Sequence, residues 1–110
     1  MREIKFRAWH KNVKCMTYNV KIDLFDKDYL ELMQYTGIKD KNGKEIYEGD
    51  IIKHHTGAIN KVWYKNGAFV LSYKNSNINL LYDLLIIDGI LPYWKVIGNI
   101  YENEDLLHNI

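Results

Sequence analysis

Cysteine and proline are nearly absent from this sequence, which has one of each in 110 residues. Because Cys15 has no second cysteine with which to form an internal disulfide, the sequence favours a reducing, cytoplasmic location. We expect Cys15 to be a half-buried structural residue in a strand rather than a reactive thiol. Pro92 cannot donate to a β-ladder, which excludes a central-strand position for this residue.

Long apolar runs and an excess of charge are absent as well. No apolar run approaches the roughly 20 residues that cross a bilayer, and the N-terminus lacks the features of a signal peptide. The net charge of +1 argues against attraction of the whole protein to nucleic acid or to anionic membranes. With 47% hydrophobic residues, the chain is long enough for one core and too short for two. We therefore expect a soluble protein with a single domain over residues 1–110 and no membrane partner.

Charge is distributed unevenly near the N-terminus. The first fourteen residues carry five basic side chains against one acid, and residues 23–31 carry four acids against one lysine. Adjacent segments of opposite charge usually neutralise each other on solvated faces. A binding patch on the basic N-terminal strands remains the alternative.

Short alternating runs separated by glycine-marked turns predict a small β-structure. Ile4, Phe6 and Ala8 alternate with polar residues and with Trp9, which indicates a strand with one buried face. An acidic loop is expected at residues 23–28, with its apolar side chains turned inward. Further strands are expected at residues 16–20, 29–35, 47–54, 62–65, 68–71 and 94–97.

Two Asn-Gly pairs predict two-residue type I′ turns, because both central positions of such turns need positive φ. At Asn66-Gly67, a two-residue loop places Tyr64 opposite Phe69 and Trp63 opposite Val70. The face of Tyr64, Phe69, Val62 and Leu71 is then core, and Trp63 is more exposed than Tyr64 or Phe69. A three-residue loop would reverse these faces. Asn42-Gly43 predicts a second hairpin of the same type.

Residues 78–87 fit either a short helix or a buried strand, and we favour a helix that ends before the Asp88-Gly89 turn. Asn103 is expected to cap a short C-terminal helix through Leu106, Leu107 and His108. The predicted fold is mostly β: an SH3-like barrel or β-roll with an N-terminal strand pair and a short C-terminal helix.

Three blocks of the sequence resemble those of a known family. They are R-E-I-K-F-R-A-W at residues 2–9, Q-Y-T-G-I-K-D-K-N-G-K-E-I-Y-E-G-D-I-I at 34–52 and W-K-V-I-G-N-I-Y-E-N at 94–103. Together they are similar to the signature blocks of the YopX family, and they span nearly the whole chain. The resemblance implies a mostly β protein with an SH3-like core, encoded by bacteriophages or prophages of Gram-positive bacteria. It implies no catalytic residues, because no activity is established for that family.

The residues offer little chemistry of their own, and we expect no catalytic residues, no metal and no cofactor. Residues 40–45 lack the length and the distal glutamate of a calcium loop. His54 and His55 are expected in a polar loop that leads to Thr56-Gly57. On a strand they would point to opposite faces unless the chain turns there, and no third ligand lies at zinc-like spacing. Glu48 and Asp50, two residues apart, would share a strand face; we interpret them as caps for backbone N–H groups. The alternative is a metal-dependent hydrolase or nuclease that uses both carboxylates.

The best local candidate for a binding site is the face of Lys61, Trp63 and Lys65, where lysines flank an aromatic ring. Our first hypothesis is a non-enzymatic binding module for an unknown host or phage protein. Weak nucleic-acid binding comes second, through this face or the basic N-terminal strands. A homo-oligomer with strands paired across chains is a further alternative.

Overall fold

The computed structural model describes residues 3–21, 27–73 and 76–108 of the chain. Most of the acidic loop expected at residues 23–28 therefore lies outside the described residues. The described part is mostly β, which confirms the predicted fold class.

Two antiparallel sheets make up the fold. The first has the strand order β2-β1-β3-β4, and the second has the order β8-β7-β6-β5-β9. The strands of the first sheet are β1 (Phe6–His10), β2 (Cys15–Tyr18), β3 (Leu30–Lys39) and β4 (Glu45–Tyr47). Those of the second are β5 (Asp50–His54), β6 (Ile59–Lys65), β7 (Ala68–Tyr73), β8 (Ser76–Leu80) and β9 (Trp94–Asn99).

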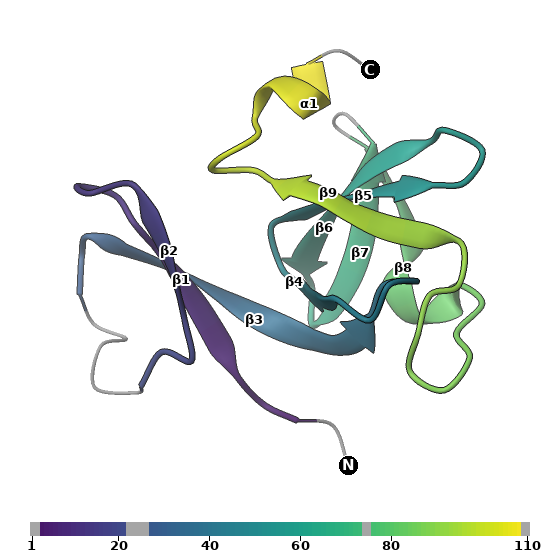
Figure 1. The fold of residues 1–110 in the computed structure, drawn as a ribbon, viewed down its shortest axis with the longest axis horizontal. Coiled ribbons are helices and arrows are strands. Elements are labelled where there is room, and N and C mark those ends of the chain that lie inside the picture. The colour runs from purple at the N-terminus through teal and green to yellow at the C-terminus, as the bar shows by residue number, and fades with distance from the viewer. Residues whose placement is uncertain (1–2, 22–26, 74–75, 109–110) are drawn as a thin grey trace.

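The second sheet curls into a half-barrel, from which β1, β2 and the first part of β3 project as a ribbon (Figure 1). The strand β3 is ten residues long, and its second half pairs with β4 beside the half-barrel. One long strand therefore belongs to both parts. The β3–β4 turn is joined to β9 by a backbone hydrogen bond from Lys41 N–H to the Trp94 carbonyl (2.9 Å) and by the Asp40 carboxylate, which accepts the Val96 N–H (2.9 Å).

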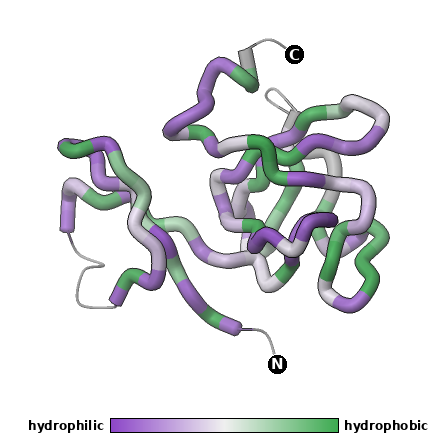
Figure 2. Tube along the Cα trace, in the orientation of Figure 1, coloured by the Kyte–Doolittle hydropathy of each residue, from purple (hydrophilic) through white to green (hydrophobic). Residues whose placement is uncertain are grey.

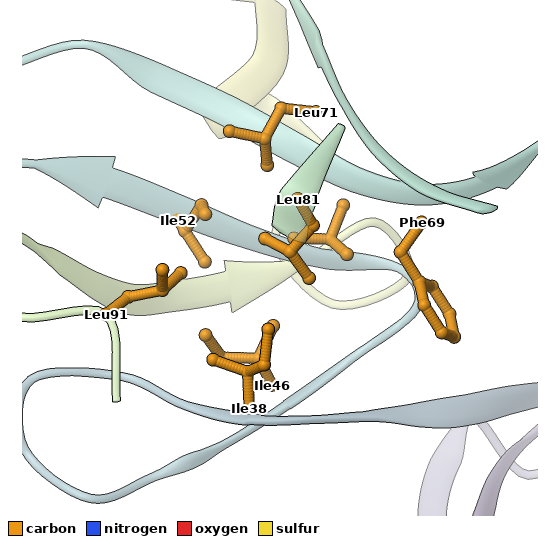
Figure 3. Packing of buried hydrophobic residues seen from close by; sticks show 8 residues of the cluster. Ile38, Ile46, Ile52, Phe69, Leu71, Leu81 and Leu91 are labelled. Atoms are coloured by element: carbon orange, nitrogen blue, oxygen red, sulfur yellow. The ribbon is translucent and has the colours of Figure 1, made fainter. Parts of the chain in front are cut away.

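The hydrophobic core lies inside the half-barrel and draws side chains from both sheets (Figure 3). Leu84, Ile86, Trp94 and Val96 pack against it from its margins. The buried cluster consists of Ile38, Ile46, Ile52, Val62, Phe69, Leu71, Leu81 and Leu91.

The N-terminal strand departs from the predicted alternation. Ile4 is exposed, whereas Arg7, expected on the polar face, is 2% exposed. The prediction assumed one buried face, but both Arg7 and its neighbour Ala8 are buried. Cys15 was expected to be half-buried and is exposed, because β2 is the edge strand of its sheet.

The hairpin of β6 and β7 has the predicted register, with Lys65 opposite Ala68 and Tyr64 opposite Phe69. Asn66 and Gly67 have φ values of +53° and +84°, as a type I′ turn requires. Phe69 is in the core, but the prediction for Tyr64 was wrong: it is 44% exposed and less buried than Trp63. Tyr64 lies at the strand end beside the turn, where its ring meets Phe69 edge to face without reaching the core.

The Asn42-Gly43 turn differs from the prediction. Gly43 has a φ of +84°, whereas Asn42 does not have positive φ, so the turn is not type I′. Asp40 is the physical reason. Its Oδ1 accepts the N–H groups of Asn42 (2.8 Å) and Lys44 (2.9 Å), and its carbonyl accepts that of Gly43 (2.9 Å). These bonds fix a longer loop between Lys39 and Glu45.

The helix expected over residues 78–87 was wrong. Strand β8 covers Ser76–Leu80, a 3₁₀ turn, η2, covers Leu81–Asp83, and residues 84–86 form neither helix nor strand. Leu81 enters the core, and β7 is available to pair with β8, so tertiary packing overrides a weak helical pattern. The expected turn at Asp88-Gly89 is present, with positive φ at both residues and mutual hydrogen bonds between Ile87 and Ile90.

A single helical turn, α1 (Asp105–His108), ends the described chain and confirms the expected C-terminal helix. The capping role predicted for the Asn103 side chain was wrong. Its Oδ1 accepts the N–H of Asn99 at 3.1 Å, so this oxygen stabilises the bend after β9.

Candidate functional site

The two carboxylates singled out by the sequence, Glu48 and Asp50, bind backbone and an arginine. Asp50 is buried, and its Oδ2 accepts the N–H of Tyr47 at 2.8 Å. Its Oδ1 lies 2.8 Å from Nη2 of Arg7. Glu48 lies in the turn before β5 rather than in a strand, and its Oε1 accepts the N–H of Gln34 at 3.3 Å. The interpretation of both residues as acceptors of backbone N–H groups is confirmed.

Arg7, which sequence reasoning missed, carries the only buried ion pair that we find among the described residues. Its Nη2 also donates to the carbonyl of Glu48 at 3.2 Å, and its guanidinium lies 4.8 Å from the ring centre of Tyr47. Nε is buried with no hydrogen-bond partner in the described part of the chain. Arg7 comes from β1 and Asp50 from β5, so this pair joins the N-terminal ribbon to the half-barrel.

Burial is the main electrostatic influence on both carboxyl groups. It raises the pKa of Asp50, although the Arg7 guanidinium and the Tyr47 N–H oppose this change. It also raises the pKa of Glu48, against the hydrogen bond from Gln34 and the charge of Arg7. Each oxygen of Asp50 thus has a partner within the protein, Oδ1 the Arg7 guanidinium and Oδ2 the Tyr47 N–H.

The candidate binding face of Lys61, Trp63 and Lys65 lies on β6, as predicted. Lys61 Nζ is 4.9 Å from the ring centre of Trp63, so one lysine covers the ring. Trp63 is only partly exposed, and Lys65 is exposed beside the turn. The structure brings these residues together but leaves less of the ring open for stacking than an exposed aromatic would offer.

An apolar segment at residues 80–87 contains four of the exposed large hydrophobic residues of the described chain. Leu84 and Ile86 pack against the core, which turns Leu85 and Ile87 outward, where each is about half exposed. Leu80 and Tyr82 are exposed nearby in sequence. Figure 2 shows the loop between β8 and β9 as a hydrophobic stretch of chain. In the sequence, the only signal of this surface was the apolar pattern at residues 78–87, which fits both a helix and a strand.

Comparison with known proteins identifies the family. The family model described as YopX protein matches residues 19–108, which is most of the chain. The chain belongs to the YopX family. The family resemblance is thereby confirmed, and the matched residues include the blocks at 34–52 and 94–103 but not the block at 2–9.

One solved structure is similar to this chain over nearly its full length. The crystal structure of protein EF1440 from Enterococcus faecalis is 27% identical to this YopX chain, with a TM-score of 0.71. The match covers 97% of this chain and 99% of that chain. No curated protein matches the sequence. The similarity to this crystal structure therefore supports the fold over nearly the whole chain, including the N-terminal ribbon.

A polar cavity of about 420 Å³ lies beside the ion pair in this YopX protein. Arg7 and Lys44 face it together with Asp50 and Glu102, so its charges are balanced. Asn99 also lines it, and Asn99 Nδ2 donates to Glu102 at 2.9 Å. The polar groups around the cavity thus bind largely to one another.

His54 and His55 lie closer together than a strand would allow, because the chain turns directly after β5. Their ring centres are 4.2 Å apart, and Nδ1 of His54 lies 2.7 Å from Oγ1 of Thr56. In the parts of the chain that the structure describes, no group of three or more histidines, cysteines and acids could hold a metal ion.

No helix among the described residues is long and apolar enough to span a membrane.

Proposed function

We propose that this YopX chain is a non-enzymatic accessory protein of a bacteriophage or prophage that binds another protein. The apolar segment at residues 80–87 is the proposed binding surface. The observation that carries the proposal is that four large apolar side chains within one eight-residue segment, those of Leu80, Tyr82, Leu85 and Ile87, are each about half exposed. Contiguous exposed apolar surface is typical of interaction sites, and the concentration of these side chains in one short segment favours such a surface over scattered single residues.

The energetics favour a protein partner at this surface. Covering two half-exposed aliphatic side chains stabilises a complex by roughly 1 kcal/mol each. Tyr82 is half exposed and its hydroxyl donates to the carbonyl of Thr36, so its ring is held in place before binding. A fixed aromatic ring loses little conformational freedom in a complex.

Charge argues against nucleic acid at the same surface. Asp83 is the only charged residue between positions 80 and 87, and the segment contains no lysine or arginine. A phosphate backbone needs cationic partners for most of its affinity. The apolar segment therefore favours protein over nucleic acid.

The alternative of a metal-dependent hydrolase that uses Glu48 and Asp50 has less support. Asp50 is buried and binds Arg7 and the Tyr47 N–H, and Glu48 binds the Gln34 N–H. A catalytic carboxylate needs free oxygens directed at substrate or metal.

The alternative of a homo-oligomer rests on β2, an edge strand with an exposed side chain at Cys15.

The test compares two charged variants with the unmodified protein in a pull-down from lysate of the host bacterium. Leu85→Asp/Ile87→Asp introduces charge into the apolar segment. Val13→Asp introduces the same charge at an exposed apolar residue in the turn between β1 and β2. The proposal expects one protein partner, resistant to nuclease, that the unmodified protein and Val13→Asp retain and the double variant loses.

Three results would contradict the proposal. They are a partner retained by the double variant, a partner lost equally by Val13→Asp, and a partner released by nuclease. Light scattering after gel filtration tests the oligomer alternative in parallel. A mass near 13.1 kDa supports a monomer that binds a different protein, and twice that mass, lost in the double variant, would assign the apolar segment to self-association.

A further inference from the structure

A cationic cluster lies at the end of the half-barrel where β5, β9 and the β3–β4 turn meet. Its side chains line a cavity of about 240 Å³, and no carboxylate is among them. The lining residues are three lysines and two histidines. They are Lys41, Lys53, His54, His55 and Lys95.

Two of these lysines occupy paired positions on neighbouring strands. Lys53 on β5 lies directly opposite Lys95 on β9 in the antiparallel register. Like charges directly opposite each other on one sheet face are destabilising. Among the described residues, neither lysine forms an ion pair that would relieve this repulsion. An anion bound between them would relieve it.

The third lysine is held beside this pair by the β3–β4 turn. Lys41 N–H donates to the carbonyl of Trp94 at 2.9 Å, one residue before Lys95. Asp40, the acid nearest to Lys41 in sequence, is 1% exposed. Its Oδ2 accepts the N–H of Val96 at 2.9 Å, and its Oδ1 binds the turn. The carboxylate of Asp40 therefore positions Lys41 and is directed at backbone N–H groups.

Aromatic rings border the cationic cluster. Tyr93 is 48% exposed, and its ring centre lies 5.1 Å from that of His55. The ring of Trp94 meets His54 edge to face at 4.8 Å. An exposed aromatic ring beside a cationic pocket is the arrangement that binds single-stranded nucleic acid, with a base stacked on the ring and a phosphate on the cations.

We propose that the cationic cluster binds the phosphodiester backbone of single-stranded nucleic acid. One or two phosphates lie among the ammonium groups of Lys41, Lys53 and Lys95, and a neighbouring base stacks on Tyr93. Double-stranded nucleic acid fits less well, because its bases are already stacked on one another and cannot reach the ring. This site shares no residue with the apolar segment, so it is independent of the proposed protein partner.

The experiment measures fluorescence anisotropy of a labelled twelve-residue oligothymidylate against the purified full chain. Each phosphate contact to a single strand contributes about −0.7 to the slope of log affinity against log salt. The slope expected for one or two phosphates is therefore about −1. Lys53→Gln/Lys95→Gln is expected to weaken binding at least tenfold, and Tyr93→Leu at least fivefold.

Lys61→Gln/Lys65→Gln is the matched control, since it removes the same charge from the face that the sequence singled out. This control is expected to bind within twofold of the unmodified protein. Thermal melting checks that each variant folds. Three results would overturn the proposal: no binding at 20 mM salt, equal weakening of binding by both double variants, or competition by polyglutamate equal to that by unlabelled oligothymidylate. Each would show that the cluster has no specific role in binding a nucleic-acid phosphate.

Discussion

Arg7 is the residue on which the junction between the two sheets most depends. Its guanidinium pairs with Asp50, donates to the Glu48 carbonyl and lies over the ring of Tyr47. Removal of one member of a buried ion pair leaves the other charge in a medium that solvates it poorly. The pair therefore makes the position of the ribbon sensitive to a single substitution.

We predict that Arg7→Met lowers the free energy of unfolding by about 3–5 kcal/mol in urea denaturation. Asp50→Asn should likewise lower the free energy of unfolding, and we expect this effect on folding to come before an effect on any activity. Lys11→Met is the control, because it breaks an ion pair with Glu31 that is about half exposed and should cost under about 1 kcal/mol. Equal losses in Arg7→Met and Lys11→Met would show that the buried pair does not hold the sheets together.

Glu48 gives a prediction about pH. Because burial raises its pKa in the folded protein, the folded state holds this proton more tightly than the unfolded chain does. The associated stability is greatest below the ordinary pKa of 4.5 and is lost as the pH rises through the folded pKa.

Urea midpoints measured between pH 4 and pH 7 test this direction. The stability of the unmodified protein relative to Glu48→Gln is expected to fall as the pH rises across this interval. The glutamine keeps an acceptor for the Gln34 N–H but cannot titrate. A relative rise in the stability of the unmodified protein would contradict the effect of burial on this pKa.

At the residue scale, the sequence identified local hydrogen-bond acceptors better than distant partners. The interpretation of Glu48 and Asp50 as acceptors of backbone N–H groups was correct, because their short side chains lie beside a glycine turn. The burial of Arg7 could not be predicted, because it depends on Asp50 from a different sheet. Alternation within one strand carries no information about such a partner.

At the scale of elements, the two Asn-Gly turns show why a local signal can fail. Asn66-Gly67 joins two strands that continue directly from the turn, and it has the type I′ geometry. Asn42-Gly43 follows Asp40, whose side chain binds the Asn42 and Lys44 N–H groups and fixes a different loop. The dipeptide alone predicts the presence of a turn, and its neighbours decide the type.

The β6–β7 hairpin gives a matched pair of truncations. Phe69 is 1% exposed, so Phe69→Ala should lower the free energy of unfolding by about 3–5 kcal/mol. Tyr64 lies directly across the hairpin but is exposed, so Tyr64→Ala should cost about 1 kcal/mol, mainly through the lost ring contact. Chemical denaturation of both variants measures the difference, and equal losses would contradict the assignment of Phe69 to the core.

The opposed lysines on β5 and β9 predict a substitution that stabilises the fold. Lys95→Gln should raise the free energy of unfolding by about 0.2–1 kcal/mol, because it removes a like charge directly opposite Lys53. Lys61→Gln lies opposite uncharged Ser72 and should give no such gain. Denaturation at low and high salt provides the measurement. A loss of stability in Lys95→Gln, or a gain that does not diminish with salt, would contradict repulsion as the cause.

Residues 78–87 mark the limit of periodicity as a predictor. Their apolar residues fit a helix and a strand equally well, and the choice depends on which neighbour pairs with them. In the fold, β8 pairs with β7, and Leu81 closes the core. The same arrangement turns Leu85 and Ile87 outward, so the error in the predicted element also concealed the candidate protein-binding surface.

For the whole molecule, the sequence predicted the fold class and the family from turns and strand patterns spread along the chain. It did not predict the half-barrel with its projecting ribbon, because that arrangement depends on the long strand β3 and the Arg7–Asp50 pair (Figure 1). The fold leaves two chemically different surfaces, one apolar and one cationic. Neither is evident from a net charge of +1.

The central claim is that the apolar segment at residues 80–87 contacts another protein. Photo-crosslinking in the host bacterium tests it most directly, with benzoylphenylalanine in place of Leu85 and, as a control, of the exposed Val13. We predict one prominent protein adduct from position 85, unchanged by nuclease, and none from position 13. No adduct at position 85, or the same adduct from both positions, would contradict the claim.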